Sequence, residues 1–126
     1  VINIQWRDGD DARLDAMREV IWGAAEKASN NHGLTIKSSC FSGYPATNID
    51  DVLQSRIKHA AELLSPGKWM TLPSGALHDA SNVSRHLPVA MLFVPSINGI
   101  SHNFAEDTEL KHLVLGAQVL GASAFP

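Results

Sequence analysis

The chain begins with alternating apolar and polar residues and then changes to a helical period. Ile2, Ile4 and Trp6 alternate with polar neighbours, which predicts a half-buried β-strand. After the turn-forming Asp8-Gly9-Asp10, apolar residues recur at the spacing of an amphipathic helix, with Asp10 or Asp11 as N-cap and Gly33 as the stop. These apolar residues are Leu14, Met17, Val20, Ile21, Ala24, Ala25 and Ala28.

A second, weaker strand is predicted at Leu34, Ile36 and Cys40, before Gly43-Tyr44-Pro45 breaks the pattern. The three elements form a strand-helix-strand unit. Composition changes around residues 42–47, so we expect a first domain over residues 1–45 and a second over residues 46–126.

The second part opens with another helical period, which Asn48 can cap and Ser65-Pro66-Gly67 ends. Its apolar positions are Ile49, Val52, Leu53, Ile57, Ala60, Ala61 and Leu64. A short strand is predicted at residues 69–72. A loop over residues 73–77 follows it, and the next helix is expected to start near His78 or Asp79.

Residues 89–94 are continuously apolar between Pro88 and Pro95, which predicts a central strand covered on both faces. A loop over residues 96–103 follows. The last helix is predicted to carry one apolar face made of Leu110, Leu113, Val114, Ala117 and Leu120. The order of strands and helices indicates an α/β fold.

The composition narrows the class of protein. The chain of 126 residues is 44% hydrophobic and 18% charged, as in ordinary globular proteins. Its net charge of -3 and scattered basic residues disfavour nucleic acid or an anionic membrane as partners. No apolar run approaches the roughly 20 residues that span a bilayer, and residues 1–7 do not resemble a signal peptide, so we expect a cytoplasmic protein. The absence of an initiating Met suggests a fragment.

Two loops that follow predicted strands each carry one histidine. His78 ends the first loop, and His102 lies in the second, which continues to Glu106. Ligands gather at such loops in α/β sheets, and Gly75 and Gly99 would let the backbone turn tightly there. Neutral imidazole binds zinc well, and Asp79 or Glu106 could orient it or bind in turn. Two histidines alone do not make a zinc site, because closed or catalytic zinc sites need three or four protein ligands.

The remaining histidines have simpler explanations. They are His32, His59, His86 and His112. We expect surface or hydrogen-bonding roles for them. His32 lies beside a predicted helix end, and His59 and His112 lie within predicted helices without a companion ligand. A surface role is the ordinary expectation for any single histidine taken alone.

The segments Ser74-Gly75-Ala76-Leu77-His78-Asp79-Ala80 and Phe93-Val94-Pro95-Ser96-Ile97-Asn98-Gly99-Ile100-Ser101-His102 resemble the closing motifs of a known enzyme group. This is the hydantoinase/carbamoylase group of dinuclear-metal amidases, which includes N-carbamoyl-L-amino acid hydrolases, β-ureidopropionases, and allantoate and ureidoglycolate amidohydrolases. Weaker similarity covers the rest of the chain. Residues 1–7 and the helix after them resemble the second half of the family's inserted lid, or dimerisation, domain. Residues 48–64 resemble the return into its catalytic domain.

The resemblance implies a zinc-peptidase-like, three-layer catalytic portion of sheet and helices, preceded by half of an α+β lid domain. It implies that the enzyme cleaves the linear C–N amide bond of a carbamoyl or ureido compound with two divalent ions, Zn, Mn or Co, and forms a homodimer through the lid. His102 would be a metal ligand. His78 would contact the substrate or polarise its carbonyl, with Asp79 beside it, and Ser74, Gly75 and Ala76 would shape the loop next to the substrate.

The chain departs from the family pattern at two places. Leu77 stands where the family usually has Gly, and Asn103-Phe104-Ala105-Glu106 replaces a tail that usually contains Pro. The family's other metal ligands and its catalytic Glu precede this segment. We therefore expect the chain alone to bind metal weakly and to be inactive.

Two alternative interpretations remain at this point. The chain could be a non-catalytic dimerisation or binding module on the same scaffold, because an exposed strand edge can pair across a two-fold axis. It could also be an unrelated α/β domain in which the two motifs occur by chance.

Overall fold

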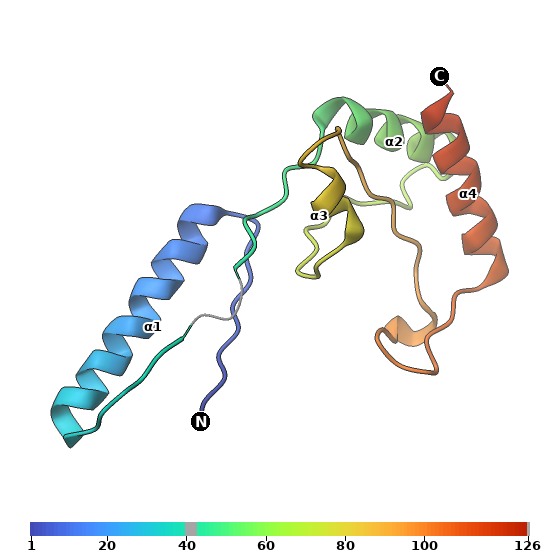
Figure 1. Cartoon of the computed structure of the whole chain (residues 1–126). Helices are drawn as coiled ribbons and strands as arrows, with labels where there is room; N and C mark the ends of the chain where they lie inside the picture. Colours follow the sequence, from blue (N-terminus) through green and yellow to red (C-terminus); the bar gives the residue numbers. More distant parts are fainter. Residues whose placement is uncertain (40–42, 126) are drawn as a thin grey trace. The chain divides into compact units, whose positions relative to one another are not determined.

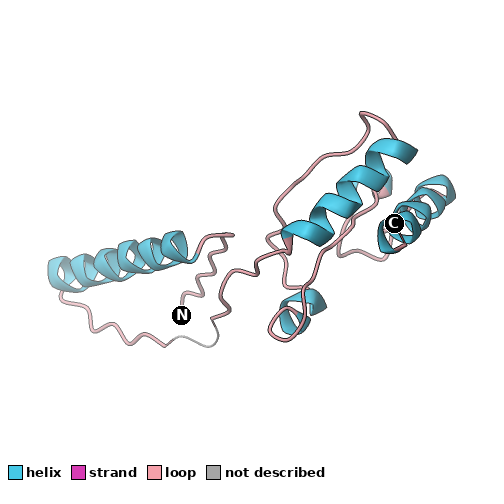
Figure 2. Ribbon diagram, turned by 90° about the horizontal axis from the view of Figure 1, so that it is seen from above, coloured by secondary structure: helices cyan, strands magenta, loops and turns pink. Residues whose placement is uncertain are grey.

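The computed structural model describes residues 1–39 and 43–125, and the regular elements in this part of the chain are helices (Figures 1 and 2). They are α1 (Asp11–His32), α2 (Asp51–Leu64), α3 (Asp79–Val83), a 3-10 helix (Ile97–Gly99) and α4 (Leu110–Ala124). The chain divides into two compact units. Val1–Thr47 and Pro73–Ala76 form the first, and Asn48–Leu72 and Leu77–Pro126 form the second. The assignment of residues 1–45 to a lid domain and 46–126 to a catalytic domain stays a prediction.

Both ends of α1 are determined by residues close in sequence. Asp10 has an extended backbone, and its side chain accepts a hydrogen bond from the N–H of Ala12 at 2.8 Å. Gly33 adopts a left-handed conformation with φ 61°, and its N–H donates to the carbonyl of Ser29. The predicted cap and stop of this helix are therefore confirmed.

The side of α1 that is least exposed follows the predicted period, although the helix has no fully buried residue. Its half-buried apolar residues are Leu14, Met17, Ile21, Ala25 and Ala28. Val20, in contrast, is 72% exposed. A hydrogen bond joins the start of the helix to the segment before α2, because the N–H of Ala46 donates to the Asp11 carboxylate at 2.7 Å.

Helix α2 begins two residues later than a cap at Asn48 would place it. The N-cap is Asp50, whose carboxylate accepts from the N–H of Leu53 at 2.8 Å. The backbone N–H of Asp50 also donates to the carbonyl of Val89 at 2.9 Å. Asp50 therefore starts α2 and joins it to the apolar segment 89–94, a tertiary contact that the local pattern around Asn48 does not contain.

Small side chains form the centre of the second unit, where α2 and α4 lie side by side (Figure 1). Ala60 is 2% exposed, Ala61 is 6% exposed and Val119 is 4% exposed. Ile57, Leu92 and Leu115 pack around them. Because alanine side chains are short, the two helix backbones can approach closely and exclude water from this cluster.

The buried stripe of α4 differs from the predicted apolar face. Val119 and Ser123 are buried and Leu115 is half-buried, whereas Leu113 is 48% exposed and Leu120 is 56% exposed. The helix is apolar on most sides, so hydrophobicity does not single out one face. The packing partner decides it, because α2 offers alanines that accept the stripe containing Leu115 and Val119.

The predicted strands at residues 2–6, 34–40, 69–72 and 89–94 form no sheet in the described part of the chain. Cys40 lies outside the described residues. A strand becomes regular structure only when a neighbouring strand supplies its ladder of hydrogen bonds. Val89 instead bonds to Asp50, which precedes a helix. Segment 89–94 is also not covered on both faces, because Phe93 is 49% exposed although Val89 is only 8% exposed. The expected three-layer sheet and α+β lid are therefore not confirmed.

Within residues 1–39 and 43–125, no helix is both long and apolar enough to span a membrane. The cytoplasmic location expected from the sequence stays a prediction.

Two glycines of α4 offer a matched test of the packing. A Cβ at Gly116 would lie 2.6 Å from Cγ1 of Val94, whereas a Cβ at Gly121 would have no atom within 4 Å. We expect Gly116→Ala to lower the free energy of unfolding by about 1–3 kcal/mol through overpacking. Gly121→Ala should raise it by about 0.5–1 kcal/mol through helix propensity. Urea denaturation of both variants measures the difference, and equal effects would contradict the close approach of segment 89–94 to α4.

Candidate active site

The loop that contains Ser74, Gly75 and Ala76 is organised from within the first unit. The N–H of Ala76 donates to Oγ of Ser74 at 3.3 Å, and the carbonyl of Gly75 accepts a hydrogen bond from Nη1 of Arg7 at 2.7 Å. Ser74 and Gly75 are exposed and Ala76 is half-buried. Sequence reasoning missed Arg7; the available signal was a long cationic side chain at the end of the first alternating segment.

The expectation that glycines allow tight turns in both loops holds for only one of them. Gly99 has φ 67°, in the left-handed region that favours glycine. Gly75 has no such positive φ, and a Cβ there would meet only Cδ of Arg7 at 3.9 Å, an ordinary contact. The backbone at Gly75 therefore does not require glycine.

His78 lies at the N-cap of α3 and is half-buried. Its ring packs against the ring of Phe93, with centroids 5.4 Å apart and planes tilted by 57°. Asp79 follows as the first residue of α3, is exposed, and lies where a helix dipole favours negative charge. The structure thus brings the end of the first motif against the start of the second, a contact that the sequence did not predict.

His102 lies on an exposed loop with an unusual backbone. Its φ is 55°, and Asn98 in the preceding 3-10 helix has φ 57°. Non-glycine residues adopt this region rarely, although His and Asn do so more readily than most. The loop is closed at its base, because the N–H of Ile97 donates to the carbonyl of Asp107 at 2.7 Å.

A tight turn follows His102. The N–H of Glu106 donates to the carbonyl of Asn103 at 3.0 Å, and Oδ1 of Asn103 accepts from the N–H of Ala105 at 2.9 Å. Oε2 of Glu106 accepts from the backbone N–H of His102 at 2.7 Å. Glu106 therefore does contact His102, as the sequence allowed, but the partner is the backbone of His102 and not its imidazole.

The donor chemistry of His102 fits a divalent metal, because an exposed imidazole on a constrained loop can bind such an ion. Zinc sites in proteins use three or four protein ligands. The described residues contain no group of three or more His, Cys, Asp or Glu side chains that could hold a metal. His102 therefore fits as one ligand of a set that this part of the chain does not complete.

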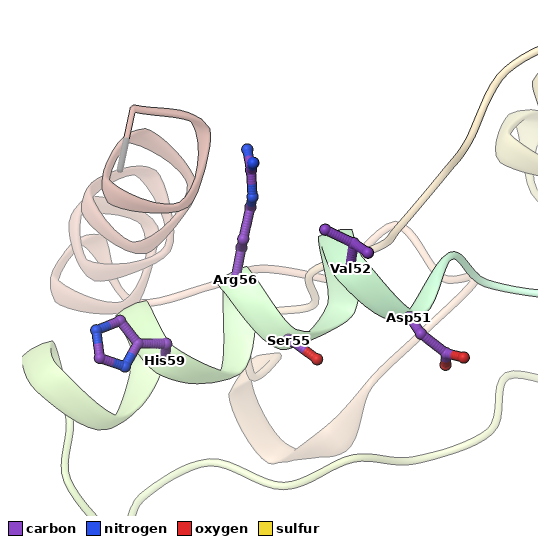
Figure 3. A pocket seen from close by; sticks show the side chains of 5 residues that line it. All are labelled: Asp51, Val52, Ser55, Arg56 and His59. Carbon is purple, nitrogen blue, oxygen red and sulfur yellow. The ribbon is translucent and has the colours of Figure 1, made fainter.

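An open hollow along α2 is a weaker candidate for a site (Figure 3). Its lining residues all come from this one helix and their side chains point in different directions. They are Asp51, Val52, Ser55, Arg56 and His59. Elsewhere, a hydrogen bond from Lys111 and its positive charge lower the pKa of Glu109. These two residues form an exposed ion pair at the start of α4. Neither feature gathers groups around a substrate.

Comparison with known proteins places these loops in a family. The chain matches the profile of peptidase family M20/M25/M40 over residues 6–124. The chain belongs to this family. A relative, the N-carbamoyl-L-amino-acid amidohydrolase of Rhizobium meliloti, is 33% identical over 120 residues, which cover 95% of this chain and 29% of the relative. The allantoate amidohydrolase of Escherichia coli (strain K12) is 46% identical over 57 residues, which cover 45% of this chain and 14% of that enzyme.

A solved structure agrees with this assignment. The crystal structure of an amidase of the hydantoinase/carbamoylase family from Burkholderia phymatum superposes with a TM-score of 0.81 at 35% identity. The superposition covers 93% of this chain and 28% of that amidase. The resemblance to the hydantoinase/carbamoylase group is therefore confirmed. This M20 chain spans less than a third of the length of these relatives.

The contact between His78 and Phe93 can be tested without any substrate. Phe93→Leu should remove the aromatic ring from beside the imidazole, whereas Phe93→Tyr should keep it. We expect the ¹H–¹³C NMR signals of the His78 ring to move in the Leu variant only. The loss of stability should be at most about 1 kcal/mol, because Phe93 is half exposed. Unchanged His78 signals in Phe93→Leu would contradict the contact.

Proposed function

We propose that this chain forms part of a metal-dependent amidohydrolase that cleaves the linear C–N amide bond of a carbamoyl or ureido substrate, such as an N-carbamoyl-L-amino acid or allantoate. The observation that carries the proposal is the constrained loop that presents His102, in a chain whose relatives are named for hydrolysis of these compounds. Membership of the M20 family supports a hydrolytic reaction.

His102 is the proposed ligand of one of two divalent ions, Zn, Mn or Co. When bound, such ions lower the pKa of water and polarise a carbonyl oxygen. The contribution of this chain is to place the imidazole. The loop tie between Ile97 and Asp107 and the left-handed backbone at His102 limit the directions that the ring can take. His102 also stays exposed, so its nitrogen can be reached by an ion held mainly by other residues.

His78 is the proposed hydrogen-bond donor to the substrate carbonyl. Negative charge grows on that oxygen when water attacks the carbon, and a positioned N–H stabilises it. The ring contact with Phe93 restricts the imidazole before substrate arrives, which reduces the entropy lost on binding. Asp79 is proposed to act beside His78. Ser74, Gly75 and Ala76 would line the substrate, with the Gly75 carbonyl already engaged by Arg7.

A second candidate function is dimerisation, either as part of the enzyme or alone as a module. The first unit exposes apolar side chains that a water-facing surface does not need: Ile2 is 85% exposed and Val20 is 72% exposed. A homodimer formed through this unit would cover them. Sedimentation of the protein with and without Val20→Lys measures this, and an unchanged molecular mass would count against a dimer interface at α1.

Replacing His102 tests the metal assignment. In the complete protein that carries this chain, we expect His102→Ala to lose bound Mn²⁺ or Zn²⁺ and to reduce ammonia release from N-carbamoyl-L-amino acids or allantoate by at least about 100-fold. His59→Ala is the control, because His59 is exposed on α2 and outside both loops. Metal analysis after dialysis and an ammonia assay give the two readouts. Full metal content in His102→Ala would contradict the proposal.

The 126-residue chain by itself should behave differently from the complete protein. With one proposed ligand among its described residues, it should bind Mn²⁺ weakly and release no ammonia from either substrate. Calorimetric titration with Mn²⁺ and the same ammonia assay measure this. Clear turnover by the isolated chain would show that the catalytic groups are complete within it.

A further inference from the structure

The backbone conformation of His102 needs a structural cause. Its φ of 55° lies in a region that L-residues rarely adopt without support from their surroundings. An exposed loop supplies little packing, and His102 and its neighbours in the loop are exposed. Hydrogen bonds are therefore the available means of holding this conformation.

The carboxylate of Glu106 provides the bond made directly to His102. It accepts from the His102 N–H at 2.7 Å, a short distance typical of hydrogen bonds with a charged partner. A single exposed hydrogen bond contributes little on its own, because water competes for both groups. Other contacts must therefore restrict the position of the carboxylate.

The turn at residues 103–106 restricts the position of this carboxylate. The N–H of Glu106 donates to the Asn103 carbonyl, and the Asn103 side chain accepts from the N–H of Ala105. These bonds define a β-turn with Phe104 at its second position, reinforced by the side chain of the first residue. The side chain of Glu106 then reaches back across the turn to His102, while the Ile97–Asp107 bond closes the loop below.

We propose that Glu106 is a positioning residue that holds the backbone of His102 in its left-handed conformation and so directs the imidazole to the metal. It acts as a hydrogen-bond acceptor for the His102 N–H and not as a metal ligand. This inference rests on the proposed function, in which His102 is a ligand.

If Glu106 is a positioning residue, Glu106→Gln and Glu106→Ala should affect metal binding differently, whereas a ligand role would predict a loss in both. Glu106→Gln keeps a carbonyl oxygen that can accept from the same N–H, whereas Glu106→Ala removes the acceptor. Without it, His102 can leave the left-handed region and swing its imidazole away from the ion. Changes to groups that orient a metal ligand typically weaken metal binding by about 10–100-fold.

The experiment uses the complete protein with Co²⁺ as the metal probe. Binding affinity and the visible absorption spectrum of the Co²⁺ form are measured for Glu106→Ala, Glu106→Gln and Glu109→Ala. Glu109 is the matched control, because it is another exposed glutamate close along the chain, and its carboxylate pairs with Lys111 and not with the His102 N–H. We expect a loss of affinity of about 10–100-fold with an altered spectrum in Glu106→Ala, a loss of no more than about threefold in Glu106→Gln, and no change in Glu109→Ala.

A second readout requires no metal. Amide hydrogen exchange of the His102 N–H in the metal-free protein should accelerate in Glu106→Ala and less in Glu106→Gln. Phe104→Pro should not restore Co²⁺ affinity to Glu106→Ala, because proline at the second position of a β-turn stiffens the turn but supplies no acceptor for the His102 N–H. Phe104 is fully exposed, so this substitution removes no buried contact.

Two results would overturn the proposal: unchanged His102 exchange in Glu106→Ala, or equal losses of Co²⁺ affinity in the Gln and Ala variants. Failure of the proposed function gives a different result. In that case His102→Ala leaves Co²⁺ affinity unchanged, while the exchange of the His102 N–H still reports whether Glu106 holds the loop.

Discussion

Close packing through small residues holds the second unit together, and the positions of His78 and His102 in that unit depend on it. Ala60 and Ala61 on α2 meet Val119 on α4, and Gly116 leaves room for Val94 at the surface of α4. Segment 89–94 can lie against α4 because Gly116 has no side chain. The end of this segment determines where Phe93 lies and where the His102 loop begins. The packing of this segment therefore supports the positions of both histidines, in addition to the ring contact of His78 with Phe93 and the hydrogen bond from the His102 N–H to Glu106.

Hydrogen bonds to the backbone hold the segments that have few packing contacts. Asp50 caps α2 and also binds the carbonyl of Val89, so one residue starts a helix and anchors the apolar segment. Arg7 binds the carbonyl of Gly75, and Glu106 binds the N–H of His102. The side chains of Arg7 and Glu106 each restrain an exposed loop through a hydrogen bond with a main-chain group of that loop. An exposed loop has few apolar contacts of its own, so its shape depends on such bonds.

The two histidines have environments suited to different tasks. His78 is half-buried against an aromatic ring, which limits its motion and its contact with water. His102 is exposed on a constrained backbone, where it can reach an ion. In the proposed enzyme the first imidazole acts on the substrate and the second holds the metal. The same residue type can do both because burial and backbone geometry, not residue identity, set its role.

The sequence by itself determined the features that depend on near neighbours. Asp10 and Gly33 set the ends of α1 through bonds to residues close along the chain, and the paired motifs around His78 and His102 were enough to indicate the family. The tertiary structure decided what depends on distant segments. It selected the stripe of α4 containing Val119, left segment 89–94 without a paired strand, and gave Glu106 a backbone partner. Helix caps form between residues close along the chain. A sheet ladder, a buried helix face and a hydrogen bond that holds a loop each require a second segment, and the linear pattern of residues does not show where that segment lies.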